Sequence, residues 1–158
     1  PDGLLDRRII AGLVFDDPGA RVELERIIHP AVRLLLFNKL RVLEQTGLPV
    51  WAILDAPLLL ESGLDQACDF LLFVEVEGAE RQRRACARHG WEAEEWEARE
   101  SAQIPLETKK SCADAILANT GDLEALRSAL APHLGTILSL APRPLQERWP
   151  ENGPSSQP

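Results

Sequence analysis

The chain has 158 residues, the length of one ordinary domain, and its 45% hydrophobic and 27% charged residues are typical of a globular protein. Its formal net charge of -8 argues against binding to nucleic acid or to an anionic membrane, because both surfaces require a basic patch. No apolar run approaches the roughly 18 residues of a membrane span. The three cysteines show no metal-binding or CxxC spacing, so we expect reduced thiols in a cytoplasmic protein.

Three helices are predicted in the first third of the chain. Apolar residues at helical spacing predict one from Leu4 to Phe15. Asp17-Pro18 supplies an N-cap followed by proline at the first helical position, so a second helix should run from there to about Ile28. His29-Pro30 repeats this signal and predicts a break, followed by a third helix from Ala31 to about Gln45.

Short apolar runs further along predict strands that are buried on both faces. They are Val50–Leu54, Phe70–Val76 and, most weakly, Ala115–Ala118. Further helices are predicted at about Ala79–His89, Glu92–Ala102, Leu106–Cys112 and Leu123–Leu134. Buried strands separated by helices indicate an α/β fold with a parallel sheet, whose ligand site lies beyond the carboxyl ends of the strands. Candidate site residues therefore fall at 55–57, 77–78 and 119–121, and the Pro-rich tail from 141 to 158 is predicted to be disordered.

Two sets of charged residues could carry chemistry. Asp55 follows a predicted buried strand, where a carboxylate suits a magnesium ion or its water shell, and an aspartate before proline equally suits a turn cap. Arg84 and Arg88 share one helix face and precede Arg99 on the next helix. Such arginines suit a phosphotransferase lid, although nearby glutamates could make them an ordinary solvated surface. His29 is expected to cap or pack beside the third helix.

A series of motifs resembles the dephospho-coenzyme A kinase family over roughly Leu4 to Leu138. No single motif is specific, but the set and its order are. The series comprises Leu5-Asp6-Arg7, His29-Pro30, Asp55-Ala56-Pro57-Leu58-Leu59-Leu60-Glu61-Ser62-Gly63-Leu64-Asp65, Arg84, Arg88, Gly90, Arg99, Gln103, Pro105, Lys109, Ala113-Asp114 and Asn119-Thr120-Gly121.

The resemblance implies an enzyme that uses ATP and Mg²⁺ to phosphorylate the 3′-hydroxyl of dephospho-coenzyme A. The implied fold is a three-layer P-loop kinase core with a parallel sheet, spanning residues 1–140. It includes a helical substrate region at about 4–46 and a lid at about 79–112. The implied site residues, sorted by role, are Asp55 and Arg88 for catalysis, Asp55 for magnesium through water, Arg84, Arg99, Asn119 and Gly121 for ATP, and Asp6, Arg7 and His29 for the substrate.

The chain departs from the family at its beginning. The family's first strand, its GxxxxGK(S/T) phosphate loop and its second strand have no counterpart, and the chain starts at Pro1 and contains no Met. We therefore expect an N-terminally truncated enzyme that is inactive alone and uses dephospho-coenzyme A and ATP when complete. Two alternatives stay open, a non-catalytic remnant that binds coenzyme A or a protein partner, and another P-loop small-molecule kinase.

Overall fold

A computed structural model describes residues 5–15, 17–47, 51–141 and 143–150 of the chain. These residues form two compact units, Pro1–Ala52 and Ile53–Pro158. The first unit is helical and the second combines helices with a parallel sheet.

The first unit consists of two helices that pack against each other, α1 (Arg7–Phe15) and α2 (Pro18–Gln45). Asp17 caps α2, because its Oδ1 accepts hydrogen bonds from the backbone N–H groups of Gly19 at 2.8 Å and Ala20 at 3.0 Å. Proline follows at the first helical position, where its missing N–H costs nothing. The predicted helix start at Asp17-Pro18 is therefore confirmed.

The predicted break at His29-Pro30 is wrong, because α2 continues through both residues. A proline inside a helix removes one hydrogen bond, here the one to the carbonyl of Arg26. The flanking segments are rich in leucine, arginine and glutamate, which favour helix on both sides of the proline. A capping pair shows where a helix can begin, and it does not show that the preceding helix ends.

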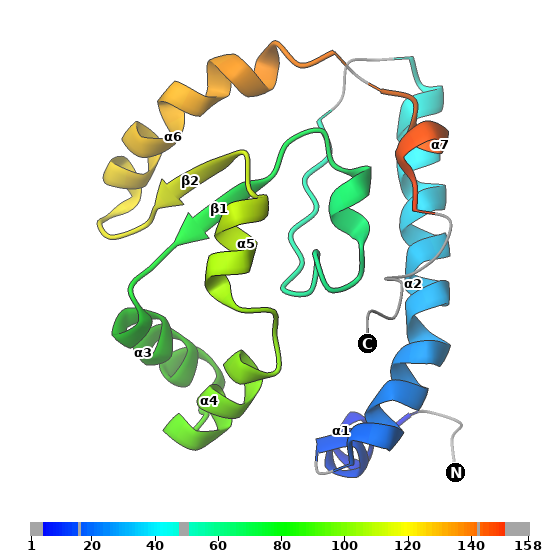
Figure 1. The fold of residues 1–158 in the computed structure, drawn as a ribbon, viewed down its shortest axis with the longest axis vertical. Coiled ribbons are helices and arrows are strands. Elements are labelled where there is room, and N and C mark those ends of the chain that lie inside the picture. Colours follow the sequence, from blue (N-terminus) through cyan, green and yellow to red (C-terminus); the bar gives the residue numbers. More distant parts are fainter. Residues whose placement is uncertain (1–4, 16, 48–50, 142, 151–158) are drawn as a thin grey trace. The chain divides into compact units, whose positions relative to one another are not determined.

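The second unit contains a two-stranded parallel sheet of β1 (Leu72–Glu75) and β2 (Ala115–Ala118). Leu72 lies opposite Ala115 and Glu75 opposite Ala118, and Figure 1 shows the two arrows side by side with the same direction. Both strands fall inside predicted apolar runs, so the parallel sheet and the α/β fold class are confirmed. The pairing continues one step further, since the backbone N–H of Asn119 donates to the carbonyl of Glu75 at 2.8 Å.

The first predicted strand is wrong for the residues that the structure describes. Trp51–Leu54 belongs to no strand, and Ile53 is 90% exposed, while Val50 lies outside the described residues. A strand that is apolar on both faces needs neighbouring strands to satisfy its backbone groups and cover its side chains. In the part of the chain described, the sheet holds only β1 and β2, so this run has no such neighbour.

The remaining helices of the second unit follow the sequence prediction closely in position and length. They are α3 (Gly78–His89), α4 (Ala93–Ser101), α5 (Leu106–Cys112) and α6 (Leu123–Leu138). α6 packs against β2 and passes Pro132 to end four residues beyond the predicted Leu134. A 3-10 helix, η1 (Leu64–Ala67), was not predicted.

Part of the tail that was predicted to be disordered is structured. Residues 145–148 form helix α7 (Leu145–Arg148), which contacts η1, and Leu145 is 2% exposed. Residues 151–158 lie outside the described part of the chain. The proline-rich composition predicts the average behaviour of the segment, whereas a buried leucine and the ion pairs of Arg143 and Arg148 with Asp69 order this short stretch.

The buried core is small and lies in the second unit. Among the described residues, the buried hydrophobic side chains are Leu64, Ala67, Leu117 and Leu145. No residue of α2 is buried, and apolar side chains such as Ile9 and Leu34 are largely exposed. None of the helices in the described ranges is both long enough and apolar enough to cross a membrane.

Candidate functional site

The carboxyl ends of the two strands meet at one edge of the sheet, and a helix begins just after each strand. α3 starts three residues after β1, and α6 starts after the turn that follows β2. Asp122 caps α6 by accepting a hydrogen bond from the backbone N–H of Ala125 at 2.9 Å. Of the positions predicted to surround a ligand, 77–78 and 119–121 therefore lie at this edge, as expected from the sheet direction.

A helical hairpin projects from this edge, formed by α3 and α4 and called the lid hairpin here (Figure 1). The turn between the two helices depends on Gly90, which has φ = 69° and donates its N–H to the carbonyl of Cys86 at 2.8 Å. Glycine adopts this left-handed conformation without the steric cost that a side chain brings. The hairpin lies within the range that the sequence assigned to a lid.

The arginines of the lid hairpin differ in how they are engaged. Arg84 donates to Glu80 at 2.7 Å, and the hydrogen bonds from Arg83 and Arg84 lower the pKa of Glu80 to about 2. Arg99 donates to Glu95, one turn earlier on α4, at 2.7 Å. Its guanidinium carbon also lies 4.4 Å from the centre of the Trp91 ring.

Arg88 is the exception among the three predicted lid arginines. It is exposed at the end of α3 and makes no hydrogen bond or ion pair with any residue in the described ranges. Arg84 and Arg99 would have to leave their glutamates to bind a phosphate, whereas Arg88 would not.

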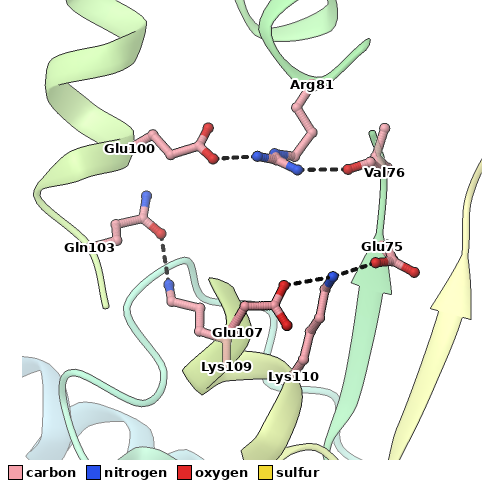
Figure 2. A network of polar contacts seen from close by, with 8 residues as sticks. All are labelled: Glu75, Val76, Arg81, Glu100, Gln103, Glu107, Lys109 and Lys110. Atoms are coloured by element: carbon pink, nitrogen blue, oxygen red, sulfur yellow. Dashed lines mark hydrogen bonds and ion pairs between the residues drawn. The ribbon is translucent and has the colours of Figure 1, made fainter. Parts of the chain in front are cut away.

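Two polar links lie at the carboxyl end of β1 (Figure 2). Arg81, in the first turn of α3, donates to the carbonyl of Val76 at 2.6 Å and pairs with Glu100 at the end of α4. Lys110, on α5, pairs with Glu75 at the end of β1 and with Glu107. Arg81 therefore joins both arms of the hairpin to the chain just after β1, whereas Lys110 braces α5 against β1.

A third link lies at the base of the lid hairpin and centres on Lys109. Its ammonium group is 2.9 Å from Oε1 of Glu61, 2.7 Å from Oε1 of Gln103 and 3.1 Å from the carbonyl of Pro57. The side chains of Lys109 and Glu61 are only 11% and 19% exposed. The backbone N–H of Ile104 also donates to Oε1 of Glu61, at 3.0 Å.

These contacts set the ionisation of Glu61. Burial by itself raises the pKa of Glu61, but the hydrogen bond from Lys109, backbone hydrogen bonds and the Lys109 charge outweigh burial and lower the pKa below its ordinary value. The other carboxylate oxygen, Oε2, is buried without a hydrogen-bond partner among the described residues. Glu61 is therefore a charged, partly unsatisfied group beneath the lid hairpin.

A cavity of about 270 Å³ lies beside this cluster, between the 56–61 segment, β1 and α5. Its walls are mainly apolar, with residues 71–74 along one side. The polar groups that reach it are Glu61, Arg81, Gln103 and Lys109. A mostly apolar hollow with a few convergent polar groups is the usual form of a small-molecule site.

Of the other predicted residues of the second unit, Asn119 and Gly121 lie at this edge of the sheet. Asp55 is exposed, and it follows extended chain rather than a strand. Asn119 directly follows β2, and Gly121 lies so close to α6 that a Cβ there would come within 2.8 Å of the Cβ of Ala125. Only glycine fits at position 121 without moving the start of α6.

The predicted substrate residues lie in the first unit. Asp6 precedes α1, and its Oδ1 accepts a hydrogen bond from the backbone N–H of Ile9 at 3.3 Å. His29 is half-buried inside α2 and caps no helix, so its predicted capping role is wrong. The side chain of Arg7 lies outside the described part of the structure.

The donor set for a metal ion is incomplete. Within the described ranges, no group of three or more His, Cys, Asp or Glu side chains could hold a metal ion. Asp55 offers one exposed carboxylate, which could contact a hydrated magnesium ion but could not form a coordination site alone.

Three residues of the site were missed as site residues by the sequence reasoning, namely Arg81, Glu61 and Lys109. Glu61 and Lys109 both belong to the motif series that carries the family resemblance. Their separation of 48 positions along the chain hides the ion pair, which only the fold brings together. Arg81 lies among several lid arginines with nothing in the sequence to distinguish it.

Comparisons with known proteins bear on the family to which the chain belongs. A family model described as dephospho-CoA kinase matches residues 1–125. The chain is 45% identical over 135 residues to a dephospho-CoA kinase of Thermus thermophilus, and 42% identical over 128 residues to one of Symbiobacterium thermophilum. These alignments cover 85% and 81% of this chain, but 64% and 53% of those proteins.

The fold is also similar to that of a solved structure. The crystal structure of TT1252 from Thermus thermophilus matches with a TM-score of 0.70 and 41% identity, covering 87% of this chain and 70% of that one. The chain thus spans roughly half to two thirds of the length of the curated relatives that it matches. On the family match, the sequence identities and the shared fold, the chain belongs to the dephospho-CoA kinase family.

Proposed function

We propose that this chain forms part of an ATP-dependent kinase that phosphorylates the 3′-hydroxyl of the ribose in dephospho-coenzyme A, the last step of coenzyme A biosynthesis. The observation that carries the proposal is the family match over residues 1–125. It is supported by a lid hairpin that bears arginines and starts at the carboxyl end of a parallel strand, where nucleotide kinases of this fold class bind their phosphates.

The proposed roles on the ATP side fall to residues around the carboxyl edge of the sheet. Arg88 approaches the transferred phosphoryl group and stabilises charge in the transition state. Arg84 and Arg99 contact the ATP phosphates once they leave their glutamates. Asn119 and Gly121 line the adenine side. Asp55 contacts the magnesium of the Mg–ATP substrate through water.

The proposed roles on the substrate side fall to the helical region at about 4–46, where Asp6, Arg7 and His29 contact dephospho-coenzyme A. This assignment treats residues 1–140 as one kinase-like domain with its lid at about 79–112. The acidic net charge of -8 supports a small-molecule substrate rather than nucleic acid or an anionic membrane. We also infer a cytoplasmic location, supported by the absence of paired cysteines among the described residues.

Activity is expected only when a phosphate loop is present. The printed sequence contains no GxxxxGK(S/T) motif. In kinases of this class the backbone N–H groups and lysine of that loop hold the β- and γ-phosphates, and no arginine of the lid can replace a loop beneath the nucleotide.

The test is an ATP-consumption assay with dephospho-coenzyme A on two proteins. One is the 158-residue chain, and the other is the same chain extended upstream along its gene to the first start codon in frame. We expect turnover only from the extended protein, and none when the lysine of its phosphate loop is replaced by alanine. A preference for a different hydroxyl acceptor in a substrate panel would assign another small-molecule kinase. If neither protein turns over and no phosphate loop is encoded upstream, the kinase proposal is refuted.

A further inference from the structure

The cluster around Lys109 joins three parts of the second unit that are distant in sequence. Lys109 lies on α5, Pro57 and Glu61 lie in the segment that follows Asp55, and Gln103 lies where the chain leaves the lid hairpin. Ile104, next to Gln103, donates its N–H to the same carboxylate oxygen of Glu61. The cluster therefore ties the end of the lid hairpin to the segment that follows Asp55.

The ammonium group of Lys109 is fully used by the protein. A lysine has three N–H donors, and here the carboxylate of Glu61, the side-chain carbonyl of Gln103 and the backbone carbonyl of Pro57 supply three acceptors within 3.1 Å. Binding a phosphate directly would require Lys109 to give up one of these partners. Only 11% of the Lys109 side chain is exposed, which is little for a lysine. Both facts indicate a role in holding the protein together locally.

Lys110, the next residue, provides an internal comparison. It pairs with Glu75 and Glu107, and its side chain is 25% exposed, so it braces α5 against β1 rather than against the lid hairpin. Arg81 braces the start of the hairpin through Val76 and Glu100. Figure 2 shows these links side by side, with Lys109 alone reaching Gln103 at the end of the hairpin.

We propose that Lys109 is a positioning residue that, through Glu61 and Gln103, holds the end of the lid hairpin in register with the segment that follows Asp55. This proposal rests on the proposed function, because the register would matter for catalysis only if lid arginines and Asp55 act on the same nucleotide. The position of reacting groups is worth a large factor in rate, since a displacement of about 1 Å can lower turnover by about 100-fold.

The first test is hydrogen exchange on the 158-residue chain, which needs no activity. Lys109→Met keeps a chain of similar length and removes the ammonium group. We expect the amides of Gln103 and Ile104 to exchange at least tenfold faster in this variant, while those of β1 and β2 are unchanged. Lys109→Arg should restore part of the protection. Arg127→Met, which removes an exposed cation paired with Glu124 on α6, is the matched control and should leave exchange at Gln103 and Ile104 unchanged.

Three exchange results would overturn the proposal. The first is unchanged exchange at Gln103 and Ile104 in Lys109→Met. The second is equal loss of protection in β1 and β2, which would make Lys109 a general stability residue. The third is absence of protection at Ile104 in the wild-type chain, because the hydrogen bond to Glu61 would then not be formed.

The second test separates this proposal from the proposed function. In the extended, active protein we expect Lys109→Met to lower kcat by about 10- to 100-fold, while KM for ATP changes by less than about threefold. A raised KM with unchanged kcat would mean that Lys109 binds phosphate directly, and would overturn a positioning role. If the wild-type extended protein does not phosphorylate dephospho-coenzyme A, the proposed function fails, and the exchange experiment alone decides whether Lys109 holds the two segments together.

Discussion

The segment 143–150, called the C-terminal strap here, depends on one carboxylate. Asp69 accepts a hydrogen bond from Nε of Arg143 at 3.0 Å through one oxygen and pairs with Arg148 through the other. Arg143 also donates to the carbonyl of Cys68 at 2.8 Å. Between the two arginines, Leu145 is buried against η1. Replacing Asp69 by asparagine should therefore release the strap.

The expected magnitude follows from the exposure of the two pairs. Arg148 is 19% exposed, and a charge-assisted hydrogen bond in such a setting contributes about 1.5–3 kcal/mol. Arg143 is 54% exposed, and an exposed pair contributes only about 0–1 kcal/mol. A loss of about 2–3 kcal/mol corresponds to roughly a 30- to 150-fold increase in the fraction of chains with the strap open.

Hydrogen exchange of residues 143–150 measures this opening directly. Asp69→Asn should speed exchange there by the stated factor, with Arg148→Met close behind and Arg143→Met much weaker. Asp65→Asn is the matched control, because it removes the same charge from the neighbouring η1. Asp65 forms no ion pair among the described residues. Equal protection of the strap in Asp69→Asn and Asp65→Asn would refute the reasoning, and so would an Arg143→Met effect larger than that of Arg148→Met.

Further predictions concern acid stability, packing and turnover. Because the pKa of Glu61 is lower in the folded than in the unfolded chain, its stabilising contribution is present above about pH 4.5 and is lost as the pH falls through the folded-state pKa. Glu61→Gln should therefore make the melting temperature depend less on pH between pH 7 and 3. An unchanged pH dependence of the melting temperature would contradict this. Gly121→Ala should destabilise the chain by about 1–3 kcal/mol through overpacking. Gly135→Ala places a Cβ in a helix interior with nothing within 4 Å, so it should stabilise the chain by about 0.5–1 kcal/mol. Similar denaturation midpoints for the two variants would contradict the packing argument. In the extended, active protein, Arg88→Ala should lower turnover with little change in melting temperature, and Arg83→Ala, which removes an exposed pair, should change neither; a large drop in melting temperature would instead assign Arg88 to structure.

The sequence predicted well those elements whose stability is local. Asp17-Pro18 marks the start of α2, and α5 and β2 occur at their predicted residues, because capping, helical periodicity and short apolar runs act over neighbouring positions. It failed where the outcome depends on distant partners. Val50–Leu54 has the composition of a buried strand, yet Trp51–Leu54 forms none, because no described segment pairs with it.

The candidate site divides in the same way. The family motifs give the residues and their order along the chain, and the parallel sheet gives the edge at which 77–78 and 119–121 meet. They do not show that Arg84 and Arg99 are engaged by glutamates while Arg88 is not. Helical spacing permits several pairings for each arginine, and the one that forms depends on side-chain geometry.

The sequence by itself determined the family, the α/β class with its parallel strands, and the helical hairpin that carries the arginines. These follow from local patterns and from an ordered set of motifs. Only the tertiary structure decided that Lys109 joins Pro57, Glu61 and Gln103, and that Asp69 holds the C-terminal strap. Ion pairs between residues 48 or 74 positions apart leave no periodic signal, because they depend on where the fold places two surfaces rather than on the chain between them.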